Sequence, residues 1–199
     1  MSGSYVRQTI DKVAGLVNRV TDLTDSDVIV GVPAESSPRS DGKITNSQLA
    51  YIHEHGSPAR NIPARPFMYP GAMRVRDQAV RMMRQGALDA VLGRGGSADQ
   101  TLQQVGILVR NSVVAEITDP EPPFTPLKPA TIRARLRRTA AGRRQLRRLK
   151  SDKAVTDWAE DGNIHPLIDT GQLRASITWV VRKEKKTFAK RIVSALRWR

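Results

Sequence analysis

The chain of 199 residues contains no cysteine, which excludes disulfide bridges, thiolate metal ligands and a cysteine nucleophile. Aromatic residues make up only 5% of the chain, so the expected core is aliphatic. No apolar run approaches the length of a membrane span, and the N-terminus has no apolar signal region. We therefore expect a single soluble domain, made in the cytoplasm, that is long enough to bury a core and has no membrane partner.

Acidic residues are scarce relative to basic ones. The 19 Asp and Glu residues stand against 33 Lys and Arg residues, which gives a formal net charge of +14. Residues 132–150 contain nine basic side chains and no acidic one. The nine are Arg133, Arg135, Arg137, Arg138, Arg143, Arg144, Arg147, Arg148 and Lys150.

Such a basic run is typical of a solvated face, of contact with phosphates, or of docking on an acidic protein ring. The run has no aromatic or amide side chains placed to read or stack on bases, so sequence-specific DNA binding is not expected. Phosphate contact and ring docking are favoured over the solvated face, and the choice between these two stays open.

Apolar residues at helical spacing predict three main helices, over residues 6–20, 71–92 and 102–117. A shorter helix is expected from Thr45 or Asn46 to Glu54, ended by Gly56. Strands are expected over residues 28–32 and in a C-terminal hairpin, residues 176–182 and 187–194. The expected fold class is α+β, with a small, mostly antiparallel sheet packed against two or three amphipathic helices.

Residues 119–166 differ from the rest in composition. Five prolines lie within residues 119–129 and the basic run follows, with only two patchy helical turns, Ile132 with Leu136 and Leu146 with Leu149. We expect a long Pro/Arg-rich arm or loop here. The expected organisation is a helix-strand-helix core over 1–118, the arm over 119–166, and a hairpin over 167–199 that completes the core sheet.

Residue types capable of catalysis are present but not arranged for it. His53 and His55 are two residues apart, so they point in different directions on a helix and cannot share a face; His165 lies elsewhere in the chain, and a metal site needs three or four convergent ligands. The Gly-rich residues 93–97 lack the Lys-Ser/Thr ending of a phosphate loop. A hydrolase or nuclease would need a carboxylate cluster, and the chain offers only the scattered Asp157, Glu160 and Asp161. We expect no enzyme, no metal and no cofactor.

Residues 166–181 have a particular order and no catalytic content. Asp169 and Thr170 are suited to capping backbone N–H groups, and Gly171 to a change of chain direction at positive φ. One helical turn and then a strand rich in β-branched and aromatic residues would follow. The predicted structural turn comprises Asp169, Thr170, Gly171, Leu173 and Arg174.

Three stretches, in this order, resemble the neck and tail-completion (head–tail joining) proteins of long-tailed bacteriophages. The first lies in residues 41–67 and shares Asp41, Gly42, Ile44, Thr45, Asn46, Leu49, Ala50, Ile52, His53, Glu54, Gly56, Ser57, Pro58, Asn61, Ile62, Pro63, Arg65, Pro66 and Phe67. The second shares Leu127, Pro129, Ala130, Thr131, Ile132, Ala134 and Arg135. The third is Leu167-Ile168-Asp169-Thr170-Gly171-x-Leu173-x-x-Ser176-Ile177. One position departs from the family: Lys128 stands where a Ser or Thr helix cap is usual, although Pro129 suits a first helical position.

The resemblance implies a structural protein of the virion neck, at the top of the tail. It implies a homo-oligomeric ring, of six-fold symmetry, stacked on connector, stopper, tail-terminator or tail-tube proteins, with the genome passing through the lumen. The interface residues expected for such a ring are Arg65, Pro66, Phe67, Leu127 and Pro129. The arm would reach a neighbouring subunit or ring. For Arg65-Pro66-Phe67 a buried aromatic anchor is the plainer interpretation and stays open.

The alternative function is non-specific binding of double-stranded DNA through the basic arm and the basic C-terminal tail. Both functions allow contact with genomic DNA, because the charge surplus attracts any polyanion. Salt-dependent duplex binding by the isolated protein would favour the alternative, and recruitment to tails would favour the neck protein.

Overall fold

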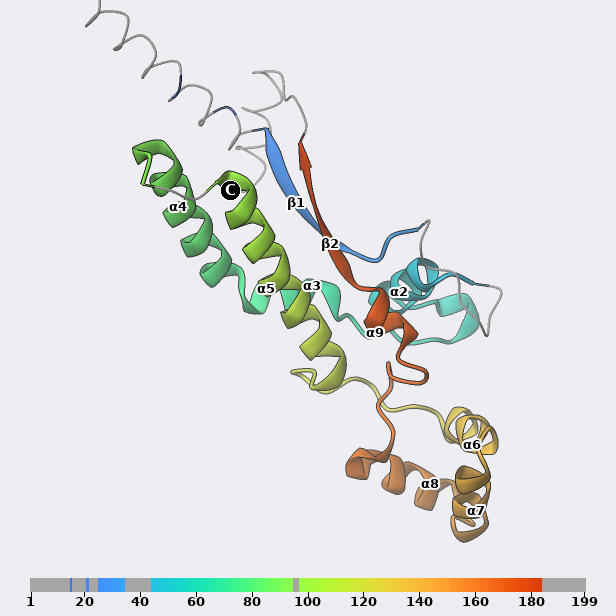
Figure 1. The fold of residues 1–199 in the computed structure, drawn as a ribbon. Helices are drawn as coiled ribbons and strands as arrows, with labels where there is room; N and C mark the ends of the chain where they lie inside the picture. The colour runs from blue at the N-terminus through green and yellow to red at the C-terminus, as the bar shows by residue number, and fades with distance from the viewer. Residues whose placement is uncertain (1–14, 16–20, 22–24, 35–43, 95–96, 184–199) are drawn as a thin grey trace, which may run out of the picture. The chain divides into compact units, whose positions relative to one another are not determined.

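The computed structural model describes residues 15, 21, 25–34, 44–94 and 97–183 (Figure 1). These residues form eight α-helices and a two-stranded antiparallel sheet, so the α+β class is confirmed. The expected strand over 187–194 and nearly all of the expected helix over 6–20 lie outside the described residues. Within the described part, no helix is both long and apolar enough to cross a membrane.

The elements follow one another in a simple order. They are β1 (Ser26–Gly31), α2 (Asn46–His55), a 3-10 turn (Pro58–Arg60), α3 (Met68–Arg74), α4 (Arg76–Leu92), α5 (Ala98–Thr118), α6 (Pro129–Arg137), α7 (Ala140–Arg148), α8 (Asp152–Trp158), a π-helical turn (Ala159–Asn163), α9 (Gln172–Ser176) and β2 (Thr178–Lys183).

The chain divides into two compact units, each built from segments that are distant in sequence. Unit 1 comprises Met1–Val30, Arg74–Arg110 and Trp179–Arg199, and unit 2 comprises Gly31–Met73 and Asn111–Thr178. Nearly all of the two paired strands, the whole of α4 and the first part of α5 belong to unit 1. Unit 2 holds α2, nearly all of α3, the end of α5, and α6 to α9. The expected boundaries at residues 118 and 166 do not coincide with the boundaries of these units; they mark changes of composition.

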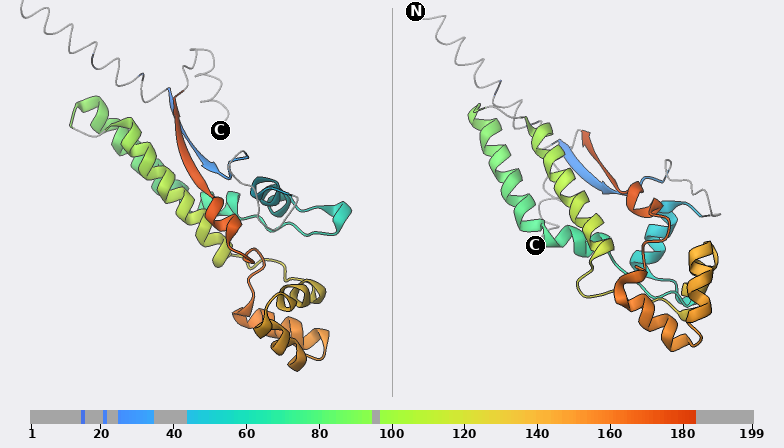
Figure 2. Two further views of the ribbon diagram at one scale, coloured as in Figure 1. Left: turned by 45° about the vertical axis from the view of Figure 1, so that its right-hand side comes forward. Right: turned by 60° about the horizontal axis from the view of Figure 1, so that its bottom comes forward.

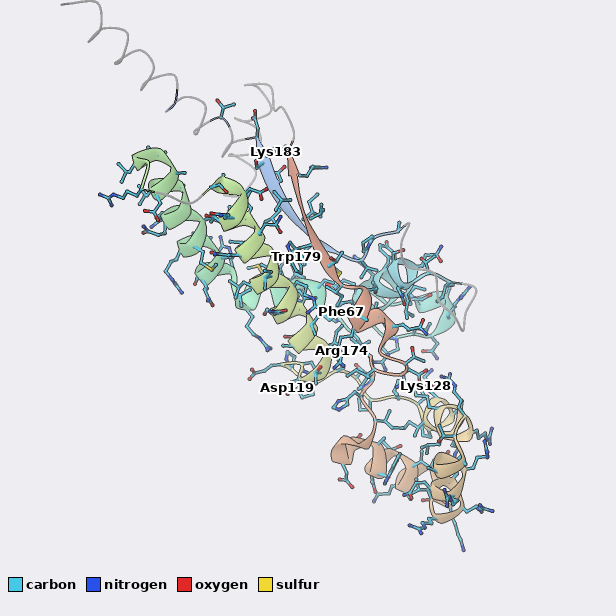
Figure 3. The ribbon with its side chains drawn as sticks, viewed as in Figure 1. Phe67, Asp119, Lys128, Arg174, Trp179 and Lys183 are labelled. Carbon is cyan, nitrogen blue, oxygen red and sulfur yellow. The ribbon has the colours of Figure 1, made fainter. Side chains whose placement is uncertain are left out.

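In unit 1 the sheet lies against α5 through one aromatic side chain. Strand β2 pairs with β1, so a strand near the C-terminus meets the first strand of the described chain. Trp179 of β2 lies between β2 and α5 (Figure 3). Its Nε1 donates to Gln103 Oε1 at 2.8 Å, and a Cβ built on Gly106 would be 2.7 Å from its Cγ. Gly106, which has no Cβ, therefore permits a close contact between α5 and β2.

Helix α5 shows the expected apolar stripe. Leu102, Val105, Val113 and Ile117 are all buried. The helix expected before it is divided in two, however, because Val75 (φ −107°, ψ 7°) breaks the chain between α3 and α4. Helix α4 ends at Leu92, as predicted, and its C-cap Gly93 adopts the left-handed conformation (φ 67°).

In unit 2, α3 packs directly on the backbone of α5. A Cβ on Gly71 would lie 2.6 Å from Val113 Cα, so only glycine permits this approach. The Ser112 hydroxyl donates to the Gly71 carbonyl at 2.6 Å and is buried there. Glycine and serine together hold the two helices in contact.

The expected arm is helical over most of its length, which differs from the extended arm or loop that composition suggested. Helices α6, α7 and α8 form a cluster that stays together in both views of Figure 2. Ile132, Leu136, Val155 and Ala159 are buried at its centre. The partly buried side chains packed on them are Leu127, Leu146, Leu149, Trp158 and Ile164. Each helix has only seven to nine residues and supplies few apolar side chains, so no single helix shows a core stripe.

Candidate interaction surface

Helix α2 is defined by local signals at both ends. Thr45 Oγ1 accepts a hydrogen bond from Gln48 N at 3.2 Å, and Gln48 Oε1 accepts one from Thr45 N at 2.9 Å. This reciprocal pair is a capping box, and it places the helix start where the sequence predicted. Gly56 ends the helix at φ 74°, and a Cβ there would lie 2.9 Å from Ala64 N.

Glu54, at the end of α2, caps a different helix. Its Oε2 accepts hydrogen bonds from Phe67 N at 2.9 Å and Met68 N at 3.0 Å, and its Oε1 accepts one from Tyr69 N at 3.0 Å. A carboxylate at a helix N-terminus accepts hydrogen bonds from the unpaired N–H groups there, and its negative charge is stabilised by the positive end of the helix dipole. This cap explains why α3 begins at Met68, three residues before the predicted start at residue 71. Sequence reasoning missed it because the partners are 13 to 15 residues apart.

Arg65 and Phe67 are buried within unit 2, with 5% and 0% of their surface exposed. Arg65 Nε donates to Thr125 O at 2.9 Å and its Nη2 donates to Pro126 O at 3.1 Å. Burial lowers the pKa of Arg65, and repulsion from Arg135 lowers it further. Their side chains are occupied inside the unit, so the predicted subunit interface does not apply to these two residues. The plainer interpretation, a buried aromatic anchor, accounts for Phe67.

Arg135 turns inward from the basic run. Its Nη1 donates to His165 O at 2.9 Å and to Ile168 O at 3.0 Å, and its Nη2 donates to Pro166 O at 2.9 Å. Only 16% of the side chain is exposed. Burial lowers the pKa of Arg135, the Asp169 carboxylate opposes that shift, and Arg138 adds to it. Arg135 therefore holds the chain that enters the third motif, and its guanidinium is not available as a surface contact.

The predicted turn at residues 169–174 is present, but its residues have other roles than expected. Gly171 has φ 76° and is itself the N-cap of α9, without any side-chain cap. Asp169 pairs with Arg138 and lies 3.9 Å from Arg135 Nε, so it forms ion pairs and the capping prediction is wrong. Thr170 and Arg174 are exposed, and Leu173 is buried.

We call Glu54, Arg65, Arg135 and Asp169, together with the backbone atoms they bond, the motif seam. Each of its four side chains belongs to one of the three motif stretches, and each bonds to a segment at least 13 residues away. The seam lies entirely in unit 2. All four positions belong to the motif stretches, yet no local pattern in the sequence predicts this role for any of them.

Several other members of the basic run bond within unit 2. Arg133 Nη2 donates to Asp152 Oδ1 at 2.8 Å, Arg138 pairs with Asp169, and Arg143 Nη1 donates to Arg137 O at 2.9 Å. The remaining side chains are exposed and form no hydrogen bond or ion pair with any described residue. These are Arg137, Arg144, Arg147, Arg148 and Lys150.

The other predicted interface residues lie near the start of α6. Leu127 packs on the helix cluster, and Pro129 is the first residue of α6, as the sequence suggested. Lys128 forms no side-chain cap, and its Nζ donates to Asn61 O at 3.4 Å instead. Pro66 is exposed. An interface at Pro66, Leu127 and Pro129 stays a prediction.

An apolar hollow in unit 2 has a volume of about 460 Å³. Its lining includes Phe124, Ile164 and the carboxylate-bearing Glu160, together with Pro120, Pro123 and Pro126 of the segment after α5. Across the described ranges, no group of three or more His, Asp or Glu side chains is placed to hold a metal ion.

No protein-family model, curated protein or solved structure matches this chain.

Proposed function

We propose that this chain is a structural protein of the neck or tail-completion region of a long-tailed bacteriophage. In this role it forms a ring that joins the DNA-filled capsid to the tail. The observation that supports the proposal is the motif seam. The three stretches are spread over more than 100 residues but lie in one compact unit. Arg65 of the first stretch bonds to carbonyls just before the second, and Arg135 of the second bonds to the Ile168 carbonyl of the third.

The motif seam is consistent with an assembly protein because its polar side chains bond to backbone N–H and C=O groups of the same unit. Glu54 caps a helix, and Arg65 and Arg135 bind carbonyl oxygens. A resemblance carried by such residues concerns the scaffold of a family and not a catalytic set. A ring needs a heterologous contact that closes on itself, which a rigid unit with exposed, charged helices can supply.

The role can be tested in the phage that encodes the chain. Disrupting the gene is expected to leave filled capsids and tails that are not joined, counted by negative-stain electron microscopy. Supplying the intact protein in trans restores joined particles. Joined, infectious particles without the protein would overturn the proposal.

A variant that lacks three exposed carboxylates distinguishes a structural role from a catalytic one. The exposed carboxylates Asp157, Glu160 and Asp161 are replaced together by Asn, Gln and Asn. A neck protein carrying these changes restores joining as well as the intact chain does, whereas a hydrolase or nuclease loses its activity. Failure of this variant to restore joining, with its circular dichroism unchanged, would count against a purely structural role.

A further inference from the structure

One face of α7 is almost purely basic. With 100° between successive residues of a helix, Arg143, Arg144, Arg147 and Arg148 fall within an arc of about 140°. Gly142 and Leu146 lie on the opposite side, toward α6 and the cluster core. In Figure 3, nitrogen-tipped side chains extend from α7 away from α6 and α8. We call these four arginines, with Arg137 and Lys150 at the edges, the α7 arginine face.

The packing of α7 fixes the direction of this face. A Cβ on Gly142 would lie 2.8 Å from the carbonyl carbon of Leu136 and 2.9 Å from its Cα, so α7 touches the backbone of α6. Thr139 Oγ1 caps α7 by accepting from Gly142 N at 3.0 Å. Arg143 also bonds to the Arg137 carbonyl. The arginines therefore project from a helix that is held in place at its start and along its inner side.

The composition of the face favours phosphate over protein as its partner. Guanidinium groups fit phosphate oxygens in pairs, and a cluster of them gains from the release of counterions. Protein interfaces instead depend on aromatic or apolar anchors at their centre. The exposed uncharged residues of α7 are only Ala140 and Ala141, so the face has no such anchor.

The same composition favours the duplex over single strands. Single-stranded nucleic acid is bound mainly by stacking bases on aromatic side chains, and the arc of arginines contains none. Base edges are read by amides or by arginines inserted in a groove, and Gln145 lies outside the arc. A convex helix face with closely spaced positive charges can instead follow the regular phosphates of a duplex.

We infer that the α7 arginine face binds the phosphate backbone of double-stranded DNA without sequence preference. This inference does not depend on the proposed function, because the face would bind duplex whether or not the chain joins particles. Of the nine basic residues of the run, only those of the α7 arginine face are then expected to contact phosphate. Arg133, Arg135 and Arg138 are excluded because they are bonded within unit 2.

The test uses the full chain and two fluorescent 30-base-pair duplexes of unrelated sequence, titrated between about 50 and 200 mM salt. We expect equal affinity for both duplexes. Replacing Arg144, Arg147 and Arg148 by Gln is expected to weaken binding at least tenfold. The negative slope of log K against log salt is expected to become shallower by about 2 to 3. Circular dichroism checks that the variant is folded.

A matched control removes the same charge from another helix. Arg76, Arg81 and Arg84 of α4 are exposed, and replacing them by Gln is expected to leave the affinity within about threefold. A second variant, with Lys at positions 144, 147 and 148, keeps the charge and is expected to keep most of the salt slope.

Three outcomes would overturn the inference. Equal losses in the α7 and α4 variants would mean that only net charge matters. Tighter binding of single strands than of duplex would point to a different site. Competition by polyglutamate as strong as that by duplex, at equal charge concentration, would make the face a docking site for acidic protein.

Discussion

Arginine has opposite roles in two regions of unit 2. In the motif seam, Arg65 and Arg135 are largely buried, and each bonds to two or more backbone carbonyls. On α7 the exposed Arg144, Arg147 and Arg148 form no bond with any described residue. Arg135 belongs to the same basic run as the α7 arginines and is only nine residues before Arg144.

The difference shows that the surroundings of an arginine, and not its place in a charged run, decide what it does. Carbonyls left unpaired in loops attract a guanidinium inward, because an unsatisfied buried oxygen is costly. Where every nearby carbonyl is already bonded within a helix, the side chain stays in solvent. A charge count alone assigns both groups the same role.

The largest expected effect comes from removing a seam arginine. Arg135→Ala leaves three carbonyls without their donor and should lower the free energy of unfolding by about 3 kcal/mol, measured by urea denaturation. Arg147→Ala, on the α7 arginine face, should change it by less than about 0.5 kcal/mol. Equal effects of the two substitutions would erase the distinction between the regions.

The parts of the fold that sequence predicted are those with local signals. The Thr45 capping box, the stop at Gly93 and the apolar stripe of α5 each depend on residues within a few turns of one another. Gly171 was likewise expected at positive φ, because its neighbours marked a turn. Such features are set by the chain's own geometry and need no knowledge of tertiary contacts.

The seam could not be predicted because its bonds join distant segments. Glu54 caps a helix beyond the next turn, and Arg135 reaches carbonyls 30 to 33 residues later. Nothing in the local pattern distinguishes Arg135 from Arg144. The α6–α8 cluster was missed for a related reason, since its core is shared between three short helices.

A smaller effect is expected where α7 meets α6. Gly142→Ala would place a Cβ against the backbone of Leu136, which cannot move aside as a side chain would. We expect a loss of about 2 kcal/mol, after the better helix propensity of Ala has offset part of a larger clash. The same variant should weaken duplex binding, because the arginines lose their fixed direction. Arg144→Ala, which weakens binding with little change in stability, is the control.

Substitution of Gly171 measures the cost of backbone strain in the absence of a steric clash. At φ 76° the residue is in the left-handed region, and a Cβ there would have open space within 4 Å. Gly171→Val should therefore cost about 1.5 kcal/mol through the backbone alone, read as a lower melting temperature. Gly171→Asn should cost less, because Asn tolerates this conformation. An unchanged melting temperature in the Val variant would contradict the role of the turn.

The smallest loss of stability is expected on replacing Asp169, at the edge of the motif seam. Its size shows whether hydrogen bonds to carbonyls or the ion pair with Asp169 keeps Arg135 buried. Asp169 is 30% exposed and Arg138 is 56% exposed, so solvent screens their ion pair. If the carbonyl bonds fix Arg135, Asp169→Asn should cost only about 0.5 to 1 kcal/mol in urea denaturation, and Arg138→Ala about the same. A loss as large as that of Arg135→Ala would mean that the carboxylate, and not the carbonyls, draws Arg135 inward. The inward and outward arginines would then differ only in their nearness to an acid.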